Sequence, residues 1–339
     1  MKPSGDLSGF AQLMELSRGF QAAKVFLVAC DLDVFSHLSI PTTVEDLASR
    51  LQVNARALEM LLNGLTALRL LSKKDNSYHN TPVAQEFLVA AGENYRGAIF
   101  KHLHHTWEGW SDLGAVVATG NHPKIDPARW VEAHAEAHEQ EVKDFIWGMH
   151  AVARDTIPLV LEQLNLKDIK HLLDLGGGPA SYAIAFAQQY PQLKATVFDL
   201  PLPISIAREN LVRHGLTSRV QTIAGNFLED DIGSGYDFIW ISQILHSHTE
   251  TQSQTILRKA CSALVPGGRL AVHDFFLDDD GYTPPSAAFF GLHMLAVTQG
   301  GRAYKHHEVA TWVESLGCSR PELRRVGEHS SFVIAVKNG

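Results

Sequence analysis

The sequence predicts an α/β protein with a mostly parallel sheet, helices on both faces of that sheet, and a helical domain in front. From Lys170 onward, strand-like and helix-like segments alternate, a pattern typical of doubly wound sheets. Before Lys170 the chain reads as almost entirely helical, apart from one hairpin. A length of 339 residues suits two domains, and a hydrophobic content of 45% is enough to build sizeable cores.

The N-terminal region reads as a long helix followed by a winged helix. Residues 9–38 are apolar on most sides, so this helix needs several covering surfaces, and a partner subunit can supply one. The winged helix would comprise a short helix capped by Thr42 or Thr43, a second helix from Asn54 and a hairpin over residues 70–80. This pattern admits DNA binding, so the charge of the region decides between that role and packing.

The charge distribution disfavours nucleic-acid binding. The second helix of the winged helix carries only Arg56 as a cation, next to Glu59, and contacts to phosphates need more positive charge. The whole chain has a net charge of -8 and a pI near 6.1, which also disfavours binding to anionic membranes. We therefore expect the winged helix to serve packing.

The remaining elements follow from hydrophobic patterning and turn residues. Residues 82–165 are expected to be mostly helical, with Trp107, Trp110 and Trp130 among them and a loop at 120–123. A tight turn is expected at 266–268. Strands are expected at 171–175, 195–198, 219–223, 236–241, 268–273 and 331–336, and helices up to Tyr190 and at 204–214, 251–264 and 307–316.

The sequence shows no targeting segment. No run at the N-terminus has signal-peptide length, and no stretch approaches the ~18 apolar residues of a membrane span. The cysteines are Cys30, Cys261 and Cys318, an odd number that fits a reducing compartment better than a disulfide framework. We therefore expect a cytoplasmic protein.

The segment that says most about function is a glycine-rich turn after a buried strand, Leu173-Asp174-Leu175-Gly176-Gly177-Gly178. A nicotinamide fingerprint would need a third glycine where Ser181 stands, and a phosphate loop would need Lys followed by Ser or Thr. Asp174 would repel a pyrophosphate group. It suits instead a ligand that carries an ammonium group, such as the methionine part of S-adenosylmethionine.

Polar residues end the next two strands as well. Asp199 stands roughly 20 residues after the glycine turn, where an acidic side chain can bind both ribose hydroxyls. Gly225-Asn226-Phe227 follows the third strand, and the Asn226 side chain can bond an adenine edge. Each feature alone is common, but three at successive strand ends indicate a ligand site.

These segments resemble the plant-type O-methyltransferases and their bacterial relatives in natural-product biosynthesis. The resemblance covers nearly the whole chain and includes Phe198-Asp199-Leu200-Pro201, Ile244-Leu245-His246 and Gly300-Gly301-Arg302. It implies an N-terminal winged-helix dimerisation domain at 1–100, a helical linker and substrate-pocket region at 101–165, and a Rossmann-like class I methyltransferase domain at 166–339. It also implies a last strand that is antiparallel, and a homodimer.

The resemblance implies S-adenosyl-L-methionine as cofactor, S-adenosyl-L-homocysteine as product and a small-molecule acceptor with a hydroxyl group. Ala180 stands where the family often has glycine, and Asn226 where an acidic residue is usual. The residues expected to bind the cofactor are Asp174, Gly176, Gly178, Asp199, Leu200, Gly225, Asn226, Phe227 and Ser242.

The resemblance also implies a catalytic base at His246. Histidine suits this task because its ordinary pKa of about 6.5 lies close to neutral pH, whereas a phenol needs help to ionise. Ser247 and His248 replace the family's usual Asp and Trp after this histidine. Asp274 and Glu328 are the acidic candidates for holding the base. The acceptor pocket is expected to include Phe289, Phe290, His293 and Met294, with His104 and Trp107 closing it.

Three alternatives remain open from the residues alone. One is a metalloenzyme, although no spacing of His and Cys matches a common zinc pattern and we expect no metal. A second keeps the cofactor but methylates nitrogen or carbon, or has lost transfer. A third is a DNA-binding regulator that senses a small molecule. The histidines available to a metal are His102, His104, His105, His246, His248, His306 and His307.

Overall fold

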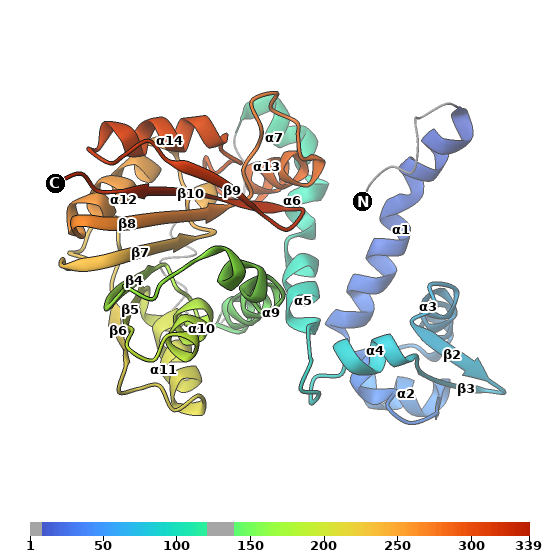
Figure 1. Ribbon diagram of the computed structural model, residues 1–339. Helices are drawn as coiled ribbons and strands as arrows, with labels where there is room; N and C mark the ends of the chain where they lie inside the picture. Colours follow the sequence, from blue (N-terminus) through green and yellow to red (C-terminus); the bar gives the residue numbers. More distant parts are fainter. Residues whose placement is uncertain (1–8, 121–138) are drawn as a thin grey trace. The chain divides into compact units, whose positions relative to one another are not determined.

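The computed structural model describes residues 9–120 and 139–339 and divides them into two compact units (Figure 1). The first unit contains the described residues up to Trp107 together with Lys143–Ala151. The second contains the described residues of Glu108–Val142 together with Val152–Gly339. Residues 121–123 of the expected loop and Trp130 lie outside the described residues, and the three-part division of the chain stays a prediction.

The first unit is a long helix with a winged helix. Helix α1 ends at Asp31, short of the predicted residue 38, because Asp33 takes a left-handed backbone conformation (φ 52°) that an α-helix cannot continue through. A short 3-10 helix follows. The small sheet has the order β1-β3-β2 and is antiparallel. The elements are α1 (Phe10–Asp31), η1 (Val34–His37), β1 (Thr42–Thr43), α2 (Val44–Leu51), α3 (Ala55–Ala67), β2 (Leu71–Lys74), β3 (Ser77–Asn80), α4 (Pro82–Phe87) and α5 (Gly97–His105).

Side-chain caps set the starts of the two helices of the winged helix. The Thr43 hydroxyl accepts the backbone N–H of Asp46 at 3.3 Å, and Asn54 Oδ1 accepts that of Ala57 at 3.0 Å. Apolar side chains of α2, α3 and the hairpin then pack into one core that includes Tyr78. The predicted cap at Thr43, the predicted start of the second helix at Asn54 and the predicted hairpin are confirmed.

The second unit is built on a seven-stranded sheet of order β6-β5-β4-β7-β8-β10-β9. Five strands run parallel, and β10 is antiparallel to both of its neighbours. The predicted fold class, with its reversed last strand, is confirmed. The strands are β4 (His171–Leu175), β5 (Lys194–Asp199), β6 (Val220–Ala224), β7 (Tyr236–Ser242), β8 (Leu264–Asp274), β9 (Glu322–Val326) and β10 (Ser330–Val336).

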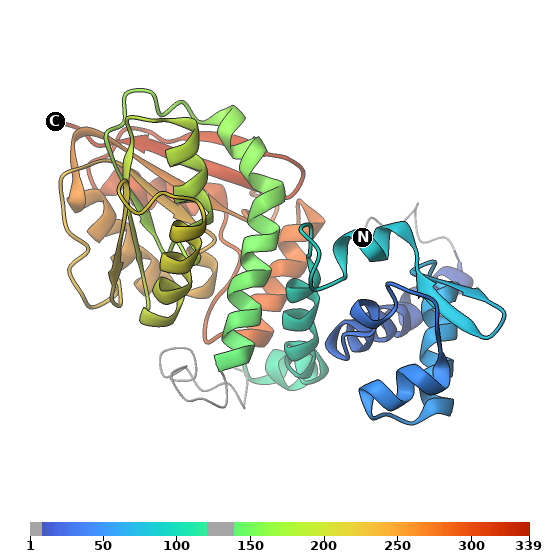
Figure 2. The same cartoon turned by 90° about the horizontal axis from the view of Figure 1, so that it is seen from below.

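Helices cover both faces of this sheet (Figure 2). The end of α9, with α10 and α11, shares one apolar core with one face, and α12 and α14 share a second core with the other. Strands buried on both faces explain why their sequences are nearly all apolar. The remaining helices are α6 (Trp107–Ser111), α7 (Leu113–Thr119), α9 (Glu139–Gln163), α10 (Ser181–Gln189), α11 (Pro201–Arg213), η2 (Leu245–Ser247), α12 (Glu250–Ala263), α13 (Pro285–Val297) and α14 (His306–Ser315).

Two further details differ from the sequence prediction. Strand β8 begins at Leu264 and runs through the expected turn at 266–268, with a register irregularity opposite Tyr236 and Phe238. Gly267 has a positive φ of 78°, so the backbone bends there without leaving the strand. Strand β9 was not predicted, because Glu322 and two arginines in its five residues hide an edge strand. Within the described residues, no helix is long and apolar enough to cross a membrane.

Candidate active site

The glycine turn lies where β4 ends, at the edge of the sheet to which all five parallel strands point. The backbone N–H of Gly176 donates to the Phe198 carbonyl oxygen at 2.8 Å, which ties the turn to β5. Gly176 has φ 73°, and a Cβ added there would collide with the side chain of Ile244. A Cβ at Gly177 would lie 2.7 Å from the carboxyl carbon of Asp174. The turn therefore needs glycine at both positions to pass this close to its neighbours.

Two carboxyl groups flank the turn, Asp174 buried and Asp199 half-buried. Asp174 Oδ2 accepts the backbone N–H of Ala183 at 3.2 Å, and burial raises the pKa of Asp174 to about 7. Asp199 accepts the N–H groups of Gly178 and Leu200, both at 2.7 Å, and burial raises its pKa to about 6. Neither carboxyl forms an ion pair with any residue that the structure describes. Two acids without a cation, one buried and one half-buried, fit a ligand that brings an ammonium group and hydroxyl groups.

The other residues expected around the cofactor occupy the same edge. Gly225, Asn226 and Phe227 follow β6, and Asn226 Oδ1 accepts the N–H of Leu228 at 3.0 Å. The Asn226 side chain is thus partly committed to its own turn. Ser242 ends β7, and its hydroxyl lies 2.9 Å from Nδ1 of the buried His273. The structure brings the nine predicted residues to the ends of four adjacent strands, β4 to β7.

A histidine and an aspartate form a close buried pair at this edge. His246 lies in η2, just after β7, and Asp274 ends β8. His246 Nδ1 lies 2.6 Å from Asp274 Oδ1, and both side chains are almost fully buried. The N–H of Phe275 donates to the same oxygen at 2.8 Å and fixes the carboxylate. With Nδ1–H donating to Asp274, the imidazole presents an unprotonated Nε2 that can accept a proton.

Aromatic and sulfur-containing side chains on one face of α13 surround this pair. The Phe290 ring meets the His246 ring edge to face, with centroids 4.7 Å apart, and also contacts Phe275 at 4.5 Å. His293 and Met294 follow on the same face, three and four residues after Phe290. Met294 Sδ lies 4.0 Å from the hydroxyl of Ser247. Phe289 is 60% exposed, so the structure gives its neighbour Phe290 the contact with His246.

The other predicted site residues are placed differently. Glu328 lies in the exposed turn between β9 and β10, and within the described residues no hydrogen bond or ion pair joins it to His246 or Asp274. His104 and Trp107 belong to the first unit, where His104 Nε2 lies 3.7 Å from Asp31 and Lys24 Nζ lies 4.6 Å from the Trp107 ring centroid. Their closure of the acceptor pocket stays a prediction.

No role in the site was predicted for Trp110, Gly301 or Arg302, although all three contact residues of the site. Trp110 donates its indole N–H to His293 Nδ1 at 2.9 Å, and only the count of tryptophans had drawn attention to it. The N–H of Arg302 donates to the His246 carbonyl oxygen at 2.8 Å, and a Cβ at Gly301 would lie 2.5 Å from that oxygen. The glycine pair before Arg302 is the signal that pointed to this close approach.

The described residues contain no cluster of side chains that could hold a metal ion. No group of three or more His, Cys, Asp and Glu side chains in that part of the chain is arranged to hold an ion. His248 Nδ1 lies 2.9 Å from the Ile244 carbonyl oxygen, and His307 Nδ1 lies 2.6 Å from Asp279. His306 Nε2 lies 2.6 Å from the Ser331 hydroxyl.

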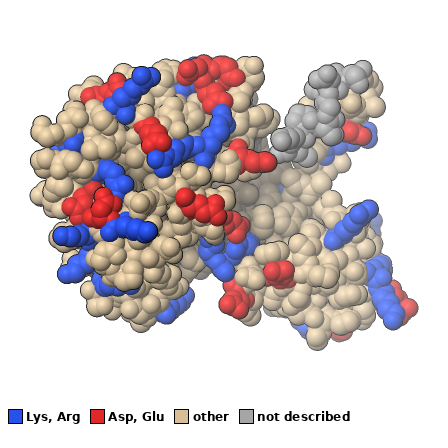
Figure 3. All heavy atoms as spheres, viewed as in Figure 1, with Lys and Arg blue, Asp and Glu red and all other residues tan. Residues whose placement is uncertain are grey.

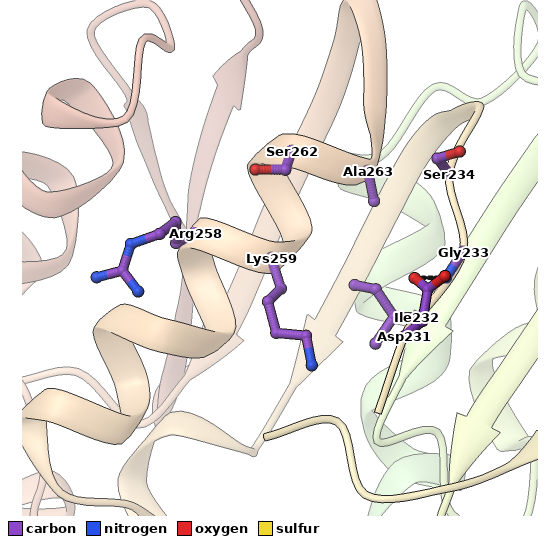
Figure 4. A pocket seen from close by; sticks show the side chains of 8 residues that line it. All are labelled: Asp231, Ile232, Gly233, Ser234, Arg258, Lys259, Ser262 and Ala263. Atoms are coloured by element: carbon purple, nitrogen blue, oxygen red, sulfur yellow. Dashed lines mark hydrogen bonds between the residues drawn. The ribbon is translucent and has the colours of Figure 1, made fainter. Parts of the chain in front are cut away.

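One surface pocket lies away from this chemistry. It is formed by the loop before β7 and the last turns of α12, and Figure 4 shows Asp231, Gly233, Arg258 and Lys259 around it. Both segments lead into the amino-terminal ends of their strands, so the pocket is at the opposite edge of the sheet from His246. We assign it no part in the reaction.

Comparison with known proteins agrees with this geometry. Residues 110–319 match the O-methyltransferase domain model, and residues 14–90 match the O-methyltransferase dimerisation domain model. The chain is 31% identical, over 93% of its length and 90% of the relative's, to a 3-hydroxy-5-methyl-1-naphthoate 3-O-methyltransferase of Streptomyces sahachiroi. It is 26% identical, over 81% of each chain, to an N,N-dimethyltransferase, OxyT, of Streptomyces rimosus.

Solved structures share the fold over the whole chain. The human N-acetylserotonin methyltransferase in complex with S-adenosylmethionine has a TM-score of 0.87 at 23% identity, with complete coverage of both chains. That likeness concerns the fold, whereas the two domain models and the Streptomyces sahachiroi relative establish the family. The chain belongs to the S-adenosylmethionine-dependent O-methyltransferase family and carries both its dimerisation domain and its methyltransferase domain.

Proposed function

We propose that this enzyme methylates a hydroxyl group on a small aromatic, natural-product-like acceptor, with His246 as the general base. The observation that carries the proposal is the 2.6 Å pair of His246 and Asp274, at the same sheet edge as the glycine turn and next to the rings of Phe275 and Phe290. A base held next to a cofactor edge suits activation of a hydroxyl that must lose its proton during transfer.

In this proposal Asp274 holds His246 in one tautomer and one orientation, so that Nε2 faces the acceptor. The positive charge that forms when Nε2 takes the acceptor's proton is balanced by the Asp274 carboxylate. Asp274 therefore supplies the carboxylate that Ser247, in place of the family's usual Asp, does not. Glu328 stays a weaker candidate for this role, because its turn lies at the same edge of the sheet without contact to the imidazole.

The cofactor supplies a methyl group on a positively charged sulfur. We assign its ammonium group to Asp174 and its ribose hydroxyls to Asp199. We assign its adenine to the segment that contains Gly225, Asn226 and Phe227. Gly176 and Gly178 keep the turn free of side chains, and Leu200 and Ser242 border it. The rings around His246 keep water from the transfer, which favours displacement over side reactions.

The acceptor class follows from the surroundings of His246. Phe290, His293 and Met294 present flat and polarizable surfaces, which suit an aromatic ring system. The relative from Streptomyces sahachiroi methylates a hydroxynaphthoate, so hydroxynaphthoates are the first acceptors to test. Phe289, His104 and Trp107 remain proposed outer residues of this pocket.

We also propose a homodimer formed through the N-terminal domain. Helix α1 exposes Phe10, Leu13, Leu16 and Phe20 by 51–77%, an apolar surface unusual for a single chain. Basic and acidic groups are intermixed over the face drawn in Figure 3, unlike the basic surface of a nucleic-acid binder. We therefore keep a small molecule, and not a nucleic acid, as the partner. A cytoplasmic location belongs to the same proposal, because Cys261 and Cys318 are buried free thiols with Sγ atoms 3.5 Å apart.

The experiment that tests the proposal compares wild type with His246→Ala on a panel of hydroxynaphthoates. We expect kcat to fall by roughly 10²–10⁴-fold while calorimetric affinity for S-adenosylhomocysteine stays the same. An unchanged kcat would show that no base is needed at this position, and loss of cofactor affinity would show that His246 serves the fold instead.

N-methylation is the second candidate, and the likeness to the N,N-dimethyltransferase OxyT favours it. An amine that is already neutral needs no base, so its rate should be insensitive to His246→Ala. Assaying aminonaphthalenes beside the hydroxynaphthoates separates the two: methylated amines with no methylated phenols would replace the first proposal by the second.

A further inference from the structure

Trp110 and His293 form a hydrogen-bonded pair that the proposed reaction does not yet use. Trp110 lies in α6 and His293 in α13, and both belong to the second unit. Their ring planes are nearly parallel, at 19°, with centroids 6.0 Å apart, and the indole N–H donates to His293 Nδ1 at 2.9 Å. An indole N–H can only donate, so His293 Nδ1 must carry a lone pair. The proton of the neutral imidazole therefore sits on Nε2.

The surroundings of His293 keep this imidazole neutral. Burial and the nearby His246 together lower the pKa of His293 to about 4. A proton added to Nδ1 would also break the bond from Trp110. At neutral pH the ring is thus a single tautomer with one fixed N–H.

That N–H is available to a ligand. Nε2 of His293 makes no hydrogen bond to any residue in 9–120 or 139–339, and it is not among the buried polar atoms that lack a partner. The atom therefore keeps some accessible surface, and His293 as a whole is half-buried. Phe290, one helical turn earlier on α13, contacts both imidazoles, with ring centroids 4.7 Å from His246 and 6.2 Å from His293.

The two histidines consequently have opposite hydrogen-bonding character. Asp274 leaves His246 with an Nε2 that accepts, and Trp110 leaves His293 with an Nε2 that donates. An acceptor molecule that contacts both histidines needs a hydroxyl group that donates to His246 and an oxygen without a proton that accepts from His293.

We propose that His293 selects acceptors that carry a carbonyl or carboxylate oxygen on the same aromatic ring system as the hydroxyl to be methylated, and that Trp110 is the positioning residue that makes His293 a donor. This inference rests on the proposed function, since it assumes that the hydroxyl lies at His246. It adds a substrate class: hydroxy-aromatic acids, aldehydes or ketones rather than simple phenols.

The test measures the ratio of kcat/KM for a matched pair of acceptors, a hydroxynaphthoate and the naphthol that lacks only the carboxylate. We expect wild type to favour the hydroxynaphthoate, and His293→Phe to lower this ratio roughly ten-fold, mostly through KM, because one hydrogen bond is lost. Trp110→Phe should lower the ratio in the same direction. His293→Gln, which keeps an acceptor for Trp110 and an N–H donor, should restore part of it.

The matched control is His171→Phe, an exposed histidine at the start of β4, which should leave the ratio unchanged. A ratio unaltered by His293→Phe, or a His293→Gln variant no better than His293→Phe, would overturn the proposal. Calorimetric binding of the hydroxynaphthoate to the protein with S-adenosylhomocysteine reads the same difference without turnover. If no phenol is methylated, the proposed function is wrong. If wild type and His293→Phe bind the hydroxynaphthoate equally well, only the role of His293 is wrong.

Discussion

At the scale of single residues, the proposed reaction depends on the states of three carboxyl groups at the sheet edge, of which Asp174 and Asp274 are buried and Asp199 is half-buried. Asp274 is fixed by a backbone N–H and holds a histidine, whereas Asp174 and Asp199 receive backbone N–H groups and no cation from the described residues. The Asp274 carboxylate has its hydrogen-bond partners, the Phe275 N–H and His246, within the chain. The other two are raised in pKa by burial, and a ligand can relieve that cost.

Replacing Asp274 tests its role as a positioning residue for His246. Asp274→Asn removes the charge that fixes the Nδ1–H tautomer, so kcat should fall by roughly 10²–10⁴-fold near pH 7. The loss should shrink toward pH ~10, where a phenol ionises without a base. The kcat/KM profile from pH 6 to 10 measures this. A loss of equal size at every pH would point to a merely structural role.

The pKa of Asp174 predicts how cofactor affinity depends on pH. In the free protein this carboxyl is half protonated near pH 7. An ammonium group bound beside it would favour the ionised form and lower its pKa, so binding would release a proton. Affinity for S-adenosylhomocysteine should therefore rise as pH increases from 5 to 7 and level off above 7.

Calorimetry of wild type and Asp174→Asn measures that dependence. The variant has no proton to release at this position, so most of the slope should vanish, with Asp199 leaving a smaller one below pH 6. A slope that survives intact in Asp174→Asn would assign the linkage to another group and remove the ammonium from Asp174.

At the scale of elements, the loop that carries His246 is supported by the loop before α14. The Arg302 N–H bonds the His246 carbonyl oxygen, and a Cβ at Gly301 would lie 2.5 Å from that oxygen. Gly301→Ala should therefore displace His246 and lower kcat about ten-fold or more, with little change in affinity for S-adenosylhomocysteine. The matched control is Gly114→Ala in α7, where a Cβ meets nothing within 4 Å. Equal kcat values for the two variants would mean that the loop absorbs the added methyl group.

The elements that the sequence predicted best are those whose signal is local. Strand β4 was predicted with its observed bounds, and the cap at Thr43 and the helix start at Asn54 follow from side-chain chemistry within three residues. Strand β9 was not predicted, because its pairing with β10 cannot be identified from local sequence. Arg324 and Arg325 also interrupt the apolar pattern of a strand. The end of α1 was missed because Asp tolerates a positive φ but does not require one, so Asp33 does not mark a helix end in the sequence.

The candidate site likewise contains residues that could be identified from the sequence and contacts that only the structure shows. Residues at strand ends, such as Asp199, could be named from the sequence because the topology itself collects them at one edge. The partnership of His246 with Asp274 needed the resemblance to be suspected and the structure to be measured. The bond between Trp110 and His293 joins residues 183 positions apart, and no local pattern indicates it.

At the scale of the whole molecule, the exposed apolar residues of α1 predict an oligomer. Leu16→Glu and Phe20→Glu place charges on that surface, so sedimentation should show a smaller species than wild type at the same concentration. The control is Val212→Glu in α11, a residue 68% exposed in the second unit, which should leave the mass unchanged. Identical masses for all variants would remove α1 from the interface.

The proposed reaction requires that one edge of the sheet bring cofactor and acceptor together at His246. A crystal structure with S-adenosylhomocysteine and a hydroxynaphthoate tests it most directly. The account predicts the amino group of the cofactor product at Asp174 and the acceptor hydroxyl oxygen within hydrogen-bonding distance of His246 Nε2. A glycine turn that excludes the adenosyl group, or an acceptor hydroxyl bound away from His246, would contradict it.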